Sequence, residues 1–252
     1  MSTLPTNIDD VLKELDSIIL ETTNDNNYLG IFAYVYRRTT AEIKNAIAGK
    51  QFTDNERMER MDVTFANKYI SAYHHFKSST GPVAGAWVVP FQSGSEKLTV
   101  MQHLLMGMNA HINFDLGVAA SETVPGDAID SLKADFMKVN DILAGLTHEM
   151  QVKTGRISWW MFLLDWIGGN KDEAVINFSM IKARKAAWNF AVTLSSLQDD
   201  TRTLKMEQAD AVTAALAEII KRPPGFLLRN ILNFMSAFEE KDVKRIIARL
   251  EE

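Results

Sequence analysis

The segment from His103 to Gly117, HLLMGMNAHINFDLG, constrains the fold of this chain more than any other feature. Its spacing predicts a helix from about residue 98 to about residue 120. When successive residues are rotated by about 100°, the apolar side chains of this helix point in nearly every direction. A helix that is apolar on all sides is a buried one. We therefore expect it to run through the centre of the protein.

The same helix carries two histidines, two asparagines and an aspartate. His111 and Asp115 are four residues apart and share a face, about 80° and 120° around the axis from His103. Asn109 and Asn113 form a second such pair at about 240° and 280°, on nearly the opposite side. An unpaired buried amide or carboxylate costs about 2 kcal/mol or more. Each of these groups therefore needs a partner inside the protein.

Two interpretations of this polarity follow. In the structural one, the polar side chains hold neighbouring helices in register, and Gly107 and Gly117 allow another backbone to come close. In the functional one, His111 is a general base oriented by Asp115, or both are ligands of a divalent metal ion. His103 lies about 12 Å further along the axis and reaches the same ion only if the helix bends at Gly107. No H-E-x-x-H or E-x-x-H pattern indicates a known class of metal site, so the cofactor stays unknown.

The rest of the chain also has a helical pattern, because most of its 13 Gly and 6 Pro fall between periodic segments. Residues 78–96 form the longest break and predict a loop, with residues 86–89 extended. Further helices are expected at residues 8–22, 28–48, 127–151, 158–167, 172–197, 206–221 and 226–238, and from residues 55 and 242 onward. No repeat or Pro-rich linker occurs. The sequence predicts one all-α domain over residues 1–252, a bundle of about eight to ten helices.

Composition narrows the class of protein. The formal net charge of −5 argues against a general nucleic-acid binder, which usually carries a basic surface. The chain has no cysteine, which excludes disulfides, thiolate metal ligands and a cysteine nucleophile. The N-terminal residues lack the pattern of a secretory signal, and no apolar run is long enough to span a bilayer. We expect a soluble cytoplasmic protein with a small-molecule ligand, and its oligomeric state is left open.

Arg184 lies on a helical stripe with Asn177, Ile181 and Trp188. An ion pair with Asp165 or with Asp115 is one interpretation of this arginine, and recognition of a substrate carboxylate or phosphate is the other. The five tryptophans are either part of the core or the walls of an apolar cavity. The phosphate-binding loops GxxxxGK and GxGxxG are absent, as is the GxSxG elbow.

The motif in the central helix resembles the signature of an uncharacterised, mainly bacterial family, domain of unknown function 5995, with the pattern H-x-L-x-G-x-N-A-H-I-N-x-D-L. Every specified position of that pattern is matched between His103 and Leu116. The segments ADFMKVNDILA and LLDWIGGNKDEAVINFSMIKARKAAWNFA are similar to later parts of the family. The resemblance implies an all-helical, stand-alone domain and favours residues 103–115 as the site. It supplies no substrate, metal or reaction.

The leading hypothesis is a small-molecule enzyme with a pocket beside the central helix. His111, oriented by Asp115, would be the general base or a metal ligand, and His103 would line the same cavity.

The surrounding residues complete this hypothesis. Asn109 and Asn113 would bind substrate or fix the helix, Arg184 would hold an anionic group, and Trp188 would belong to an apolar wall. The alternative is a non-catalytic small-molecule-binding or scaffold protein whose buried polar network is structural. If His111 and Asp115 border a cavity that holds ordered water or an ion, the enzyme is favoured, whereas the alternative is favoured if both are sealed in and fully satisfied by neighbouring side chains.

Overall fold

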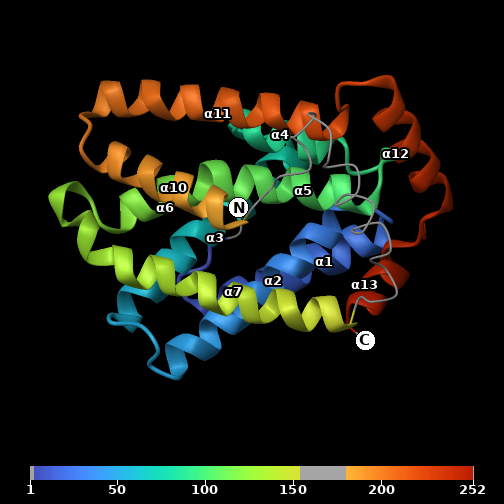
Figure 1. The fold of residues 1–252 in the computed structure, drawn as a ribbon. Helices are drawn as coiled ribbons and strands as arrows, with labels where there is room; N and C mark the ends of the chain where they lie inside the picture. The colour runs from blue at the N-terminus through green and yellow to red at the C-terminus, as the bar shows by residue number, and fades with distance from the viewer. Residues whose placement is uncertain (1–2, 154–179, 252) are drawn as a thin grey trace.

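A computed structural model describes residues 3–153 and 180–251, with the side chains of residues 144–153 left aside. The described residues form helices joined by turns, with no strand among them (Figure 1). The predicted all-α class is therefore confirmed. The expected helix at residues 158–167 lies outside the described residues, as does the first part of the helix expected at residues 172–197.

The N-terminal half consists of α1 (Ile8–Asn24), α2 (Leu29–Ala48), α3 (Asn55–Ser78), α4 (Gly85–Gln92), α5 (Val100–Ala110), the π-helical turn η1 (His111–Asp115) and α6 (Leu116–Thr123). A 3-10 segment η2 (Gly126–Leu132) leads into α7 (Lys133–Lys153). The remaining described helices are α10 (Met180–Ser195), α11 (Asp199–Lys221), α12 (Phe226–Phe238) and α13 (Val243–Glu251). Most boundaries agree with those expected from the periodicity, although α11 begins several residues earlier.

The central segment α5–η1–α6 lies inside the bundle, as its all-round apolar pattern predicts. Helices α2, α4 and α11 pack against α5, while α3 and α10 pack against α6. In Figure 1, α11 runs along the top and α7 along the bottom, with α5 and α6 between them. The buried side chains of this segment divide between two clusters. Ala110, Phe114 and Val118 join the cluster of α1, α3 and α4, whereas Ile112, Leu116 and Ala120 join that of α7 and α10.

Two glycines permit close packing of the central segment. A Cβ on Gly107 would lie 2.6 Å from Cγ of Phe32, and a Cβ on Gly117 would lie 3.0 Å from the carbonyl oxygen of Ala187. Because real Cβ contacts at these distances are repulsive, both positions require glycine. Gly117 thus meets the backbone of α10, while Gly107 meets a side chain of α2.

The expectation of a loop with extended residues 86–89 is wrong, because Gly85–Gln92 form the helix α4. Eight residues are too few for a helix that is stable by itself in water. Asp210 of α11 stabilises its first turn, accepting hydrogen bonds from the backbone N–H groups of Gly85 and Ala86, both at 2.7 Å. Its negative charge is also favourable beside a helix N-terminus. Because Asp210 is distant in sequence, the stretch itself shows no sign of this stabilisation. Its Gly and Pro content therefore predicted a loop.

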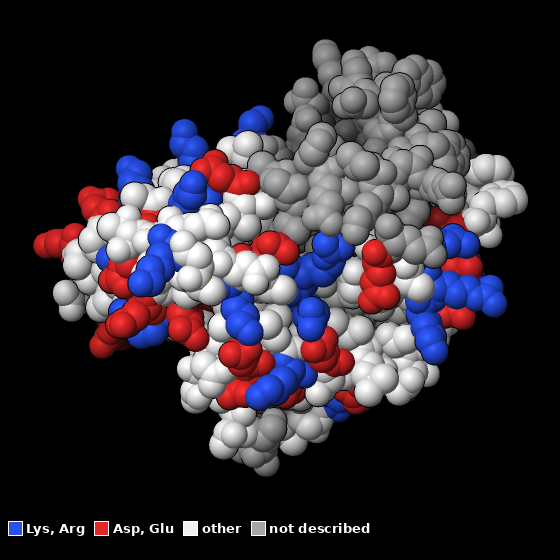
Figure 2. All heavy atoms as spheres, turned by 90° about the horizontal axis from the view of Figure 1, so that it is seen from below, with Lys and Arg blue, Asp and Glu red and all other residues white. Residues whose placement is uncertain are grey.

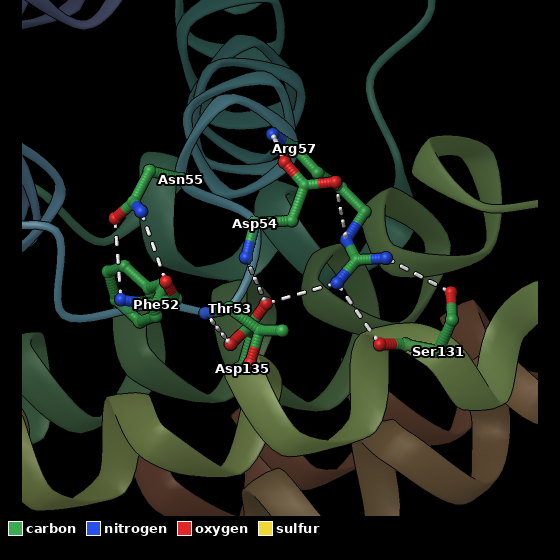
Figure 3. A network of polar contacts seen from close by, with 7 residues as sticks. All are labelled: Phe52, Thr53, Asp54, Asn55, Arg57, Ser131 and Asp135. Atoms are coloured by element: carbon green, nitrogen blue, oxygen red, sulfur yellow. Dashed lines mark hydrogen bonds and ion pairs between the residues drawn. The ribbon is translucent and has the colours of Figure 1, made fainter.

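A second carboxylate, Asp135 of α7, fixes the beginning of α3 (Figure 3). Its two oxygens accept hydrogen bonds from the backbone N–H groups of Thr53 and Asp54, at 2.7 and 3.1 Å. The guanidinium of Arg57 lies 3.0 Å from the same carboxylate and also donates to Ser131. Burial by itself would raise the pKa of Asp135, but the hydrogen bonds from Thr53, Asp54 and Arg57 outweigh it and lower that pKa. This network ties α3 to α7.

On the face shown in Figure 2, basic and acidic side chains of the described residues are interspersed rather than grouped by sign. Such mixing produces no strong field of one sign over that face. Among the helices that can be described, none has the length and apolar content needed to cross a bilayer.

We predict that Asp210→Asn destabilises the protein by about 1–3 kcal/mol, because the variant weakens two charge-assisted hydrogen bonds to the first turn of α4. Urea unfolding of this variant and of Glu207→Gln, an exposed substitution on the same helix, measures the difference. Equal stability of the two variants would show that Asp210 does not hold α4.

We predict that Asp135→Asn lowers the free energy of unfolding at neutral pH by about 3 kcal/mol, because Arg57 loses its buried counter-charge. A carboxylate with a lowered pKa stabilises the fold above its unfolded pKa, and this contribution disappears as the pH falls below about 4. The deficit of the variant should therefore shrink in acid. Chemical unfolding as a function of pH measures it, with Asp141→Asn, exposed on the same helix, as the control. A deficit that does not change with pH would contradict the prediction.

Candidate functional site

A cavity of about 100 Å³ lies beside the central segment, between α2, α3, α7 and α10. An engineered cavity of about 150 Å³ in another protein binds benzene, so this one suits a small ring or short chain. Its wall is mainly apolar, with Phe, Met, Ile, Leu and Val side chains from all these helices. The polar residues on the wall are Tyr36, Thr39, Asp62, His111 and Arg184.

The ring of His111 is packed between aromatic rings at this cavity. It stacks on Phe65 with a centroid separation of 3.6 Å and meets Tyr36 edge-on at 4.2 Å. Both of its ring nitrogens, Nδ1 and Nε2, are buried and have no hydrogen-bond partner. Burial lowers the pKa of His111, since it disfavours the imidazolium more than the nearby Asp115 favours it. The imidazole is therefore neutral at neutral pH and is available as a base.

Asp115 lies beside this imidazole. Its Oδ2 atom is 3.5 Å from Nδ1 of His111, longer than an ordinary hydrogen bond. The same oxygen accepts a 2.8 Å hydrogen bond from Nε1 of Trp87 on α4. Burial raises the pKa of Asp115, and the contacts with His111 and Trp87 oppose that rise. A carboxylate next to Nδ1 favours the tautomer with the proton on Nδ1, which leaves the lone pair on Nε2.

The helical geometry here differs from the expected α-helix. Residues His111–Asp115 form a π-helical turn, in which the N–H of Leu116 donates to the carbonyl oxygen of His111. Single π-helical turns within α-helices are rare and occur frequently at functional sites. The wider turn begins at His111 and ends at Asp115, and these two residues form a His–Asp dyad. Sequence periodicity at the ordinary α-helical angle cannot reveal such a turn.

Asp62 of α3 also lines the cavity, and sequence reasoning missed it. Although the residue is partly exposed, its Oδ2 atom is fully buried and has no hydrogen-bond partner. Burial and the nearby charge of Glu59 raise the pKa of Asp62 to about 7. The hydroxyl of Tyr36 is likewise buried, and the Thr40 side chain lies beside it. A signal was present, because Asp62 lies four residues after Met58, within the apolar stripe of its helix.

A model of a family of unknown function, DUF5995, matches residues 8–223. The match covers most of the 252 residues. The chain belongs to the DUF5995 family. No curated protein and no solved structure matches the chain. Every residue that lines the cavity of this DUF5995 protein lies within the matched region, whereas α12 and α13 lie beyond it.

The two asparagines of the central segment, Asn109 and Asn113, connect helices and do not line the cavity. Nδ2 of Asn109 donates to the carbonyl oxygen of Thr213 on α11, at 2.9 Å. Nδ2 of Asn113 donates to Oδ1 of Asn109, also at 2.9 Å. These bonds fix α5 against α11. Of the two roles expected for the asparagines, the geometry favours fixing the helix.

His103 of α5 does not line this cavity, contrary to expectation. Its ring stacks on Tyr28 at 4.5 Å, and its Nε2 donates to the carbonyl oxygen of Glu96, at 3.2 Å. Burial lowers the pKa of His103 to about 4. The two turns of helix between His103 and His111 place them in different surroundings, because no bend at Gly107 brings them together.

Arg184 lines the cavity but makes no ion pair with Asp115. Its Nε donates to Oδ1 of Asn140 at 2.6 Å, and its Nη2 donates to the carbonyl oxygen of Phe136 at 2.7 Å. The guanidinium also lies over the ring of Phe136, at 4.7 Å. Burial lowers its pKa to about 10, so it remains a cation at neutral pH. The other predicted partner, Asp165, lies outside the described residues.

Trp188 is buried in the cluster of α7 and α10, where its ring meets Phe136 at 5.1 Å. It is not part of the cavity wall, contrary to expectation. The described residues contain no group of three His, Cys, Asp or Glu side chains that could hold a metal ion. His111 and Asp115 therefore lack a third ligand of these types among them, whereas catalytic zinc sites use three protein ligands.

We predict that Trp87→Phe destabilises the protein by about 1–3 kcal/mol more than Trp188→Phe, measured by thermal or urea unfolding. Both variants remove a buried indole, but only Trp87 donates to a buried carboxylate. In a double-mutant cycle with Asp115→Asn, the Trp87 variant should show coupling and the Trp188 variant should not. Zero coupling in both cycles would mean that the indole does not stabilise Asp115.

Proposed function

We propose that this chain is a small-molecule enzyme whose cavity binds a largely apolar substrate, with His111 as the general base. The observation that carries the proposal is the buried, unpartnered Nε2 of a neutral imidazole at the wall of an apolar cavity. A perturbed titratable group beside a cavity favours an active site over a packing role. The cysteine-free composition also favours a cytoplasmic location.

The chemistry assigned to the dyad is a proton transfer. Nε2 of His111 takes a proton from the bound substrate, and the imidazole becomes an imidazolium. The Asp115 carboxylate, held by Trp87, stabilises this charge and keeps the Nδ1 tautomer in place. The surrounding aromatic rings exclude water, which strengthens the interaction between imidazolium and carboxylate. General-base catalysis of this kind contributes about 10²- to 10⁴-fold in rate.

The alternative is a non-catalytic binding or scaffold protein. The Asn109–Thr213 and Asn113–Asn109 hydrogen bonds favour it, because this part of the polar network connects helices and is satisfied. The unsatisfied nitrogen of His111 favours the enzyme instead.

The test uses exchange of substrate protons with solvent. Wild-type protein is incubated in D₂O with a panel of small apolar ketones, aldehydes and esters, and loss of acidic C–H signals is followed by NMR. We expect His111→Asn to slow the exchange by about 100-fold or more. The matched control is His75→Asn, at a partly exposed histidine away from the cavity, whose Nδ1 lies 3.0 Å from the carbonyl oxygen of Pro82. Lower stability of His111→Asn, with no wild-type exchange of any compound, would support the structural alternative.

A further inference from the structure

We infer that the cavity selects an apolar molecule that carries a protonated amine, with the Asp62 carboxylate and the Tyr36 hydroxyl as the groups that receive it. The inference rests on the cavity of the proposed function and names its substrate class. It does not depend on catalysis by His111.

The first argument is the missing partner of Asp62. Its Oδ2 atom is buried, and no hydrogen bond reaches it. Buried carboxylates in proteins are normally paired with a cation or with several donors, as Asp135 is here. A ligand ammonium would supply both the counter-charge and the donors. The Tyr36 hydroxyl, which is also buried and lies beside the Thr40 side chain, can accept a hydrogen bond from the same group.

The second argument is the aromatic lining beside Asp62. Phe32, Tyr36 and Phe65 all line the cavity, and the ring of Tyr36 contacts both of the others. The centroids of Phe32 and Tyr36 are 5.9 Å apart, and those of Tyr36 and Phe65 are 6.0 Å apart. The face of such a ring attracts an ammonium group, because the ring quadrupole is negative there. A carboxylate among aromatic rings thus forms a site for an organic cation.

The charged groups around Asp62 determine whether the cavity favours a cationic or an anionic ligand. Glu59, on the same helix, adds negative potential. The other titratable groups on the cavity wall are Tyr36 and His111, both neutral at neutral pH, and Arg184. Arg184 already has Asn140, Phe136 and the Phe136 ring as partners, so it needs a ligand less than Asp62 does. The cavity therefore favours a cation near Asp62 over an anion near Arg184.

The test compares three probes of similar shape by calorimetry: benzylamine, benzyl alcohol and benzoate. We expect wild-type protein to bind benzylamine about tenfold or more tightly than either other probe at about pH 8, where Asp62 is ionised. In Asp62→Asn the preference for benzylamine should fall below about twofold. Glu56→Gln, exposed on the same helix, is the matched control and should keep the wild-type preference.

A second measurement does not depend on any variant. At about pH 6, benzylamine should displace a proton from Asp62, so the binding heat should vary with the ionisation enthalpy of the buffer. Tighter binding of benzoate, equal binding of all three probes or no binding of benzylamine would overturn the inference. A normal preference for benzylamine in His111→Asn would show that selectivity and catalysis are separate. Failure of the exchange test alone would leave this inference standing.

Discussion

Burial of the helix from Val100 to Thr123 is the constraint on which the rest of the structure depends. The backbone of this helix forms its own hydrogen bonds, but folding also removes polar side chains from water. The buried ones include two imidazoles (His103 and His111), two amides (Gln102 and Asn109) and the carboxylate of Asp115. Most of these groups form a hydrogen bond with a neighbour: Asn109 with Thr213, Asp115 with Trp87, and His103 with a backbone carbonyl. Three buried ring nitrogens have no hydrogen-bond partner: Nδ1 of His103, and Nδ1 and Nε2 of His111. Of these two residues only His111 lines the cavity, so it marks the position where a ligand has most to contribute.

The chemical properties of the cavity depend on the residues that lie around His111. His111 and Asp62 come from different helices, yet both line one apolar space and both have an unpaired buried atom. Burial raises the pKa of Asp62 to about 7 and lowers the pKa of His111 below its ordinary value, because it disfavours the charged form of each group. An imidazole that stays neutral and a carboxyl that titrates near neutral pH are suited to proton exchange and to charge recognition, respectively.

Two carboxylates outside the cavity keep its walls in place. Asp135 ties the start of α3 to α7, and both helices contribute to the wall. Asp210 ties α4 to α11 and so positions Trp87, which holds Asp115. The dyad thus depends on a chain of contacts from α11 through α4. Loss of either tie would alter the site without touching a residue on the cavity wall.

The sequence by itself determined the all-α class, most helix boundaries and the burial of the central helix, because these follow from local periodicity over many residues. The motif of the central helix likewise pointed to the family that the match over residues 8–223 shows. Only the tertiary structure decided that α4 is a helix, that His103 and Trp188 lie away from the cavity, and that Asp62 lines it. The physical reason is that each of these outcomes depends on a partner from a distant part of the chain. Periodicity shows that a side chain is buried, but only packing shows what it is buried against.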